Sequence, residues 1–129
     1  RYEEARQAAA RAVESVRAEH GNCYQLAQFI DTQGEIALAA GDPSGATELF
    51  QQAVDTLRQS GAWDGTTANF LRNLGIAQRE LGRWDEARAS WETALQIVGV
   101  TDYAFFDSIS RAELNDLITS LPTTATAAP

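Results

Sequence analysis

The chain has 129 residues, no methionine and a single cysteine, Cys23. One cysteine excludes a disulfide within the chain and favours a reducing compartment. The single histidine, His20, lies close by in sequence, but one Cys and one His fall short of the ligands of a closed zinc site. We therefore interpret the pair as a capping histidine and a buried thiol, and expect neither a metal ion nor a cofactor.

Lysine is also absent, so all ten basic residues are arginine, and 18 acidic residues leave a net charge of −8. An acidic chain without a basic patch neutralises few phosphates, so we expect this segment to bind no nucleic acid. No apolar run approaches the roughly 20 residues that cross a bilayer, and we expect no membrane partner. We expect a cytoplasmic location.

The sequence offers no arrangement of residues that is typical of an enzyme. It contains neither a Ser/His/Asp order nor a glycine-rich phosphate loop. The carboxylate pairs Glu3-Glu4 and Asp85-Glu86 stand where helices are expected to begin, and negative charge there complements the helix dipole. We therefore predict that the chain is not an enzyme.

Two adjacent stretches predict an antiparallel helix pair. The first stretch has apolar residues at steps of three and four and ends at Gly82, which can adopt the left-handed conformation that closes a helix. Its apolar residues are Phe70, Leu71, Leu74, Ile76, Ala77 and Leu81. The second stretch places Ala87, Trp91, Ala94, Leu95 and Val98 on one face. Small residues would let the helices approach closely, with Trp91 filling the gap between them.

The same pattern recurs 41 residues earlier, which predicts a repeat protein. Gly34, Gly41, Ala46, Phe50 and Ala53 have the spacing of Gly75, Gly82, Ala87, Trp91 and Ala94. One period earlier still, residues 1–6 align with residues 83–88. The predicted helices cover residues 2–19, 22–40, 44–60, 66–81, 84–98 and 103–121, with Pro43 at the first turn of the third. The residues expected to point inward from the second helix are Tyr24, Ala27, Ile30, Gly34, Ala37 and Leu38. Those expected to be buried on the third helix are Leu49, Phe50, Ala53, Val54 and Leu57.

Residues 73–95, NLGIAQRELGRWDEARASWETAL, resemble a tetratricopeptide repeat (TPR). Leu74-Gly75, Gly82, Trp84, Ala87, Trp91 and Ala94 stand at the family's positions, whereas Gln78 replaces its usual Tyr and Gly99 its usual Pro. The resemblance implies an all-α fold, a TPR-like α-solenoid of antiparallel helix pairs with about six helices in a right-handed superhelical array. It also implies a protein–protein interaction module.

The predicted helical repeat domain covers residues 1–121. Within it, residues 1–20 form the second helix of a truncated repeat, 22–60 and 64–99 form two repeats, and 102–121 form a terminal capping helix. Residues 122–129 form a flexible tail. Because the chain starts within a repeat, we expect a fragment of a longer protein, similar to TPR arrays of bacterial multidomain regulators.

The resemblance implies that the first helix of each pair lines a concave face that binds a peptide or partner protein. The candidate residues are Asn69, Arg72, Asn73, Ile76 and Arg79, with Gln28, Asp31, Thr32 and Glu35 in the preceding repeat. Asn73 stands where related proteins contact the backbone of an extended peptide, since an amide both donates and accepts. Arg72 and Arg79 offer forked donors that suit a carboxylate. The alternative interpretation is a solvated helix face.

Two further hypotheses concern partners. The chain has no lysine and carries Arg and Asn on the candidate face of one repeat, so we do not expect it to form the carboxylate clamp of chaperone-binding TPR proteins.

The helix over residues 1–20 is expected to lack the first helix of its repeat. It could pair with a second copy of itself through an apolar face that includes Ala9, Ala12 and Val13, giving a homodimer. The substitution Ala9→Glu would test that pairing.

Overall fold

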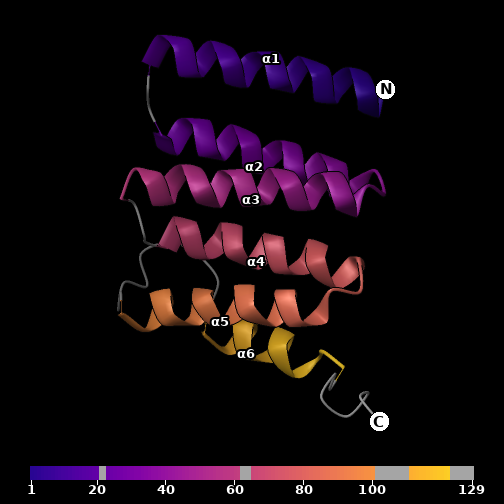
Figure 1. Cartoon of the computed structure of the whole chain (residues 1–129), viewed down its shortest axis with the longest axis vertical. Coiled ribbons are helices and arrows are strands. Elements are labelled where there is room, and N and C mark those ends of the chain that lie inside the picture. The colour runs from indigo at the N-terminus through magenta and orange to yellow at the C-terminus, as the bar shows by residue number, and fades with distance from the viewer. Residues whose placement is uncertain (21–22, 62–64, 101–110, 123–129) are drawn as a thin grey trace. The chain divides into compact units, whose positions relative to one another are not determined.

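The computed structural model describes residues 1–20, 23–61, 65–100 and 111–122, and over these the chain forms six α-helices and no strand (Figure 1). The helices are α1 (Tyr2–His20), α2 (Cys23–Ala39), α3 (Pro43–Gln59), α4 (Gly65–Glu80), α5 (Trp84–Val100) and α6 (Arg111–Thr119). The predicted all-α fold is confirmed. The first part of the predicted sixth helix and most of the predicted tail lie outside the described residues, and the superhelical course of the array stays a prediction.

The chain divides into two compact units, residues 1–62 and 63–129. In the first unit, α2 and α3 form a helix pair and α1 lies along α2. In the second unit, α4 and α5 form the pair and α6 packs against α5. The two pairs are those that the spacing of glycines and aromatic residues predicts.

Each helix pair is packed around a contact between a glycine and an aromatic ring. A Cβ atom on Gly34 would lie 2.5 Å from the ring of Phe50, and one on Gly75 would overlap the indole of Trp91. Both aromatic side chains are fully buried. The prediction that Trp91 fills the gap between its two helices is therefore confirmed.

The helix ends follow local chemistry. Gly82 has φ of +76°, as expected for the residue that terminates α4, and Gly41 follows α2 with φ of +85°. Asp42 caps the start of α3, because its Oδ1 accepts a hydrogen bond of 2.9 Å from the N–H of Gly45. Pro43 occupies the first turn, where its missing N–H costs nothing.

A buried polar bridge joins the helices of the second unit. The hydroxyl of Ser90 on α5 donates to Oε1 of Gln78 on α4 at 2.7 Å, and both side chains are buried. Gln78 stands where the family pattern has tyrosine. The amide therefore connects α4 to α5 at a position where an aromatic ring would fill space.

The buried face of α2 differs from the predicted one at several positions. Tyr24, predicted to point inward, is 42% exposed, whereas Leu26 and Gln33 are buried. Because α2 packs against both α1 and α3, a wide part of its surface is buried. Tyr24 lies outside that part. Other predicted core residues are only half-buried, and Ile97 is buried on α5. These half-buried residues are Leu38, Leu49, Ile76, Leu81, Leu95 and Val98.

Candidate functional site

The residues predicted to bind a partner on α4 share one side of that helix but differ in exposure. Asn69, Arg72, Ile76 and Arg79 are half-exposed. Asn73 is only 9% exposed, so it belongs to the packed part of the second unit, contrary to its expected place on an open face. The helical pattern of α4 places Asn73 on the same side of the helix as Arg72. Whether a side chain on that side is exposed also depends on which other elements pack over it.

Arg72 is engaged within the chain. Its Nη1 lies 3.0 Å from Oε1 of Glu113 on α6, and these side chains are 31% and 45% exposed. Its backbone carbonyl accepts a hydrogen bond of 3.0 Å from Nε1 of Trp91. Sequence reasoning missed Glu113, although it follows Arg72 by one period of 41 residues. Equivalent positions of successive repeats lie side by side in a solenoid, so the period was the available signal.

Arg79 is held over the core aromatic of its own pair. Its guanidinium carbon lies 5.8 Å from the centroid of the Trp91 ring, a distance at which a cation is attracted to the ring face. Its Nη2 is also 3.8 Å from the carboxylate of Glu80. The side chain stays 34% exposed, so the positive charge remains accessible at the C-terminal end of α4.

On α2 the predicted positions are again divided by burial. Gln28, Thr32 and Glu35 are exposed, whereas Asp31 is only 6% exposed and does not lie on an open face as expected. Sequence reasoning missed Phe29 and Ile36. These large apolar side chains are 37% and 40% exposed, and they lie one heptad apart on the same side of the helix as Thr32. This exposed side, with Phe29, Thr32 and Ile36 at its centre, is called the α2 face below.

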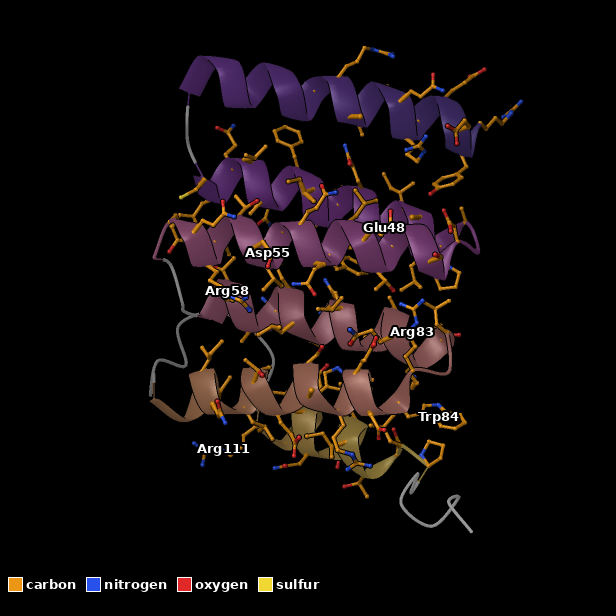
Figure 2. All side chains as sticks on the ribbon, viewed as in Figure 1. Glu48, Asp55, Arg58, Arg83, Trp84 and Arg111 are labelled. Carbon is orange, nitrogen blue, oxygen red and sulfur yellow. The ribbon has the colours of Figure 1, made fainter. Side chains whose placement is uncertain are left out.

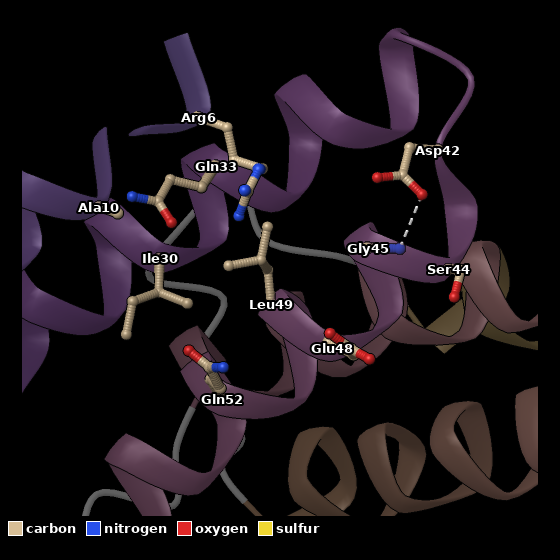
Figure 3. Close-up of a pocket in the computed structure, with 10 residues that line it drawn as sticks. All are labelled: Arg6, Ala10, Ile30, Gln33, Asp42, Ser44, Gly45, Glu48, Leu49 and Gln52. Atoms are coloured by element: carbon tan, nitrogen blue, oxygen red, sulfur yellow. Dashed lines mark hydrogen bonds between the residues drawn. The ribbon is translucent and has the colours of Figure 1, made fainter. Parts of the chain in front are cut away.

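The first unit also contains a cavity of about 480 Å³ between α1, α2 and the start of α3 (Figure 3). No residue of this cavity was among the predicted binding residues, because its position depends on how α1 packs against α2. Its lining residues are Arg6, Ala10, Ile30, Gln33, Asp42, Ser44, Gly45, Glu48, Leu49 and Gln52.

Hydrogen bonds hold one edge of this cavity in place. Tyr2 on α1 donates its hydroxyl to Oδ2 of Asp42 at 2.9 Å. The backbone N–H of Gly45, followed by the Tyr2 hydroxyl, lowers the pKa of Asp42 below its ordinary value. Burial, and then the bond to Asp42, raises the pKa of Tyr2. On α1, Arg6 donates to both carboxylate oxygens of Glu3, at 2.6 and 3.2 Å, which lowers the pKa of Glu3.

Other features bear on metal, membrane and nucleic-acid binding. Across the described ranges, no three His, Cys, Asp or Glu side chains come together as metal ligands. None of the helices described is long and apolar enough to cross a membrane. On α3, Arg58 lies 3.8 Å from the carboxylate of Asp55, so this arginine is paired with an acid (Figure 2).

Residues 68–98 match the family model of the tetratricopeptide repeat. This span includes most of α4 and α5, with the contact between Gly75 and Trp91 at its centre. No curated protein matches the chain. Tetratricopeptide repeats generally mediate protein–protein interaction and are typically not catalytic. Residues 68–98 of the α4–α5 helix pair are therefore similar to a tetratricopeptide repeat.

Proposed function

We propose that each unit binds a peptide or partner protein through the outward side of the first helix of its pair, α2 in the first unit and α4 in the second. The observation that carries the proposal is the tetratricopeptide repeat at residues 68–98, since this repeat generally serves protein binding. On α4 the binding side chains are Asn69, Arg72, Ile76 and Arg79, which remain half-exposed. They combine an amide, two guanidinium groups and one apolar anchor, and suit a peptide that carries a carboxylate.

The α2 face contributes apolar contact. Phe29 and Ile36 are the exposed anchors, and Gln28, Thr32 and Glu35 surround them with polar groups. Protein interfaces draw much of their affinity from a few aromatic or large aliphatic side chains within a polar rim. We therefore assign Phe29 a larger share of the binding free energy than the polar residues beside it.

The same proposal includes the setting of the chain in a bacterial regulatory protein of the cytoplasm. Its support is the resemblance of residues 73–95 to repeats of bacterial regulators.

Self-association of the chain is the alternative function. On α1, Ala9 and Ala12 are half-buried, whereas Ala5 and Ala8 are exposed. If two copies pair through α1, Ala8→Glu would disrupt the dimer more directly than Ala9→Glu, and light scattering over a range of concentrations would detect it.

The experiment begins with selection of binding peptides from a displayed random library on the full chain. Calorimetry then gives the Kd of a selected peptide for the wild type, Phe29→Ala and Arg79→Ala. We expect one of these substitutions to raise Kd about tenfold, which corresponds to about 1.4 kcal/mol.

Matched controls are available on the same and neighbouring helices. Tyr24→Ala removes an equally exposed aromatic that lies roughly 140° around α2 from Phe29. Arg88→Ala removes an arginine of α5. Both should leave Kd unchanged. A selected peptide whose affinity responds to the controls but to neither Phe29→Ala nor Arg79→Ala would refute the proposed binding surface.

A further inference from the structure

We propose that the cavity between α1, α2 and α3 is a second binding site, which takes a peptide segment with a basic side chain. The cavity of about 480 Å³ falls within the roughly 300–1,000 Å³ of ligand pockets. Its α2 wall is formed by Ile30 and Gln33, which belong to the buried side of that helix. The site is therefore separate from the α2 face and does not rest on the function proposed above.

The buried amide of Gln33 offers an unused hydrogen-bond donor to a ligand. This side chain lines the cavity although the residue is only 6% exposed, and its Nε2 is buried with no hydrogen-bond partner in the described part of the chain (Figure 3). Buried amides are nearly always hydrogen-bonded, because removing them from water without a partner is unfavourable. A half-turn about the terminal torsion presents either the donor or the acceptor of the amide. A peptide carbonyl in the cavity would accept from Nε2.

The charges around the cavity favour a cation. Asp42 is already bonded to Tyr2 and Gly45, and Arg6 is paired with Glu3. Glu48, by contrast, is exposed at the cavity and forms no hydrogen bond or ion pair within the described residues. Its carboxylate is therefore the charge left to pair with a ligand, and an anionic ligand would meet two carboxylates there.

The remaining wall is apolar. Ala10, Ile30 and Leu49 line the cavity, and Figure 3 shows Leu49 between Gln33 and Glu48. The methylene stem of a lysine or arginine packs well on such a surface while its charged end reaches a carboxylate. A basic residue within a peptide thus supplies all three matching groups, namely a backbone carbonyl, an aliphatic stem and a cation.

The test is a nitrogen-15 NMR titration of the full chain with the peptide acetyl-Leu-Lys-Leu-amide. We expect saturable shifts in the backbone amides of residues 30–33 and 44–52. Replacing the lysine of the peptide by norleucine, or Glu48 by Gln, should raise Kd about two- to fivefold, the range for a partly exposed ion pair. Glu92→Gln makes the same charge change at an exposed position of α5 and should leave Kd unchanged.

A second variant separates binding from stability. Gln33→Leu removes the unpaired amide, so we expect a higher melting temperature together with a roughly fivefold weaker peptide affinity. A simple structural role for Gln33 would not raise stability and lower affinity at once. The proposal is overturned if no saturable shift occurs, if Glu48→Gln binds as tightly as the wild type, or if the shifts are confined to the exposed sides of α2 and α4.

Discussion

The indole of Trp91 rests on the backbone of Gly75, and its Nε1 donates to the carbonyl of Arg72 at 3.0 Å. The α4–α5 repeat therefore depends on the absence of a side chain at one position of α4. Phe50 and Gly34 repeat this contact in the α2–α3 pair. Because an aromatic ring occupies the space of a Cβ atom, the usual advantage of alanine over glycine in a helix should reverse here.

Gly75→Ala should lower the free energy of unfolding by about 1–3 kcal/mol, the usual cost of overpacking. Alanine at an unobstructed helix position would instead stabilise by up to about 1 kcal/mol relative to glycine. Urea denaturation followed by circular dichroism measures the change. The control is the same substitution in a Trp91→Leu background, where it should be neutral or favourable. An equal loss in both backgrounds would show that the indole is not the obstacle.

Ser90→Ala should destabilise the chain by about 1–3 kcal/mol, because Oε1 of Gln78 would stay buried without its donor. Thr93→Ala is the matched control, since among the described residues the hydroxyl of Thr93 donates to the carbonyl of Ala89 within its own helix. That substitution should change stability by less than about 0.5 kcal/mol. Thermal unfolding of the two variants side by side would measure the difference, and equal effects would contradict a special role for the bridge.

Much of the fold could be predicted because its determinants are local. Gly82 ends a helix through its own backbone conformation, and the spacing from Gly75 to Trp91 fixes which residues meet when two helices fold back. The repeat period of 41 residues then predicts the same contact between Gly34 and Phe50. Such signals require no knowledge of what surrounds the pair.

The candidate site was harder to predict because exposure depends on neighbours beyond one helix. Asp31 and Asn73 follow the pattern of outward residues, yet both are buried. The pairing of Arg72 with Glu113 joins residues 41 positions apart on α4 and α6, so the pattern within either helix alone does not reveal it. The cavity at Gln33 exists only because α1 packs along α2, and the composition of α1 does not specify that arrangement.

Asp42 should make stability depend on pH. Its folded-state pKa is lowered, so its contribution is present above the unfolded value of about 3.9 and is lost as pH falls through the lower folded value. Asp42→Asn keeps a capping side chain without a titrating group. Chemical denaturation between about pH 6 and 2 should therefore show a shallower loss of stability for this variant than for the wild type.

The hydroxyl of Tyr2 contributes to the same effect. Tyr2→Phe removes a donor to Asp42, so the folded-state pKa of Asp42 should rise toward its ordinary value. The loss of stability on acidification should then begin at higher pH than in the wild type. Titration of the Asp42 carboxyl by carbon-13 NMR measures the shift directly, and an unchanged pKa in Tyr2→Phe would contradict the assigned cause.

Glu113→Gln should release Arg72 from its ion pair at little cost in stability. A partly exposed pair contributes at most about 1 kcal/mol, and a double-substitution cycle with Arg72→Ala should give a coupling energy of that size that shrinks at high salt. For a selected peptide that carries a carboxylate, the freed guanidinium should improve affinity by up to about fivefold. Glu92→Gln provides the control for the change in net charge. If Glu113→Gln leaves the affinity unchanged while Arg72→Ala weakens it, Glu113 does not compete with the peptide for Arg72.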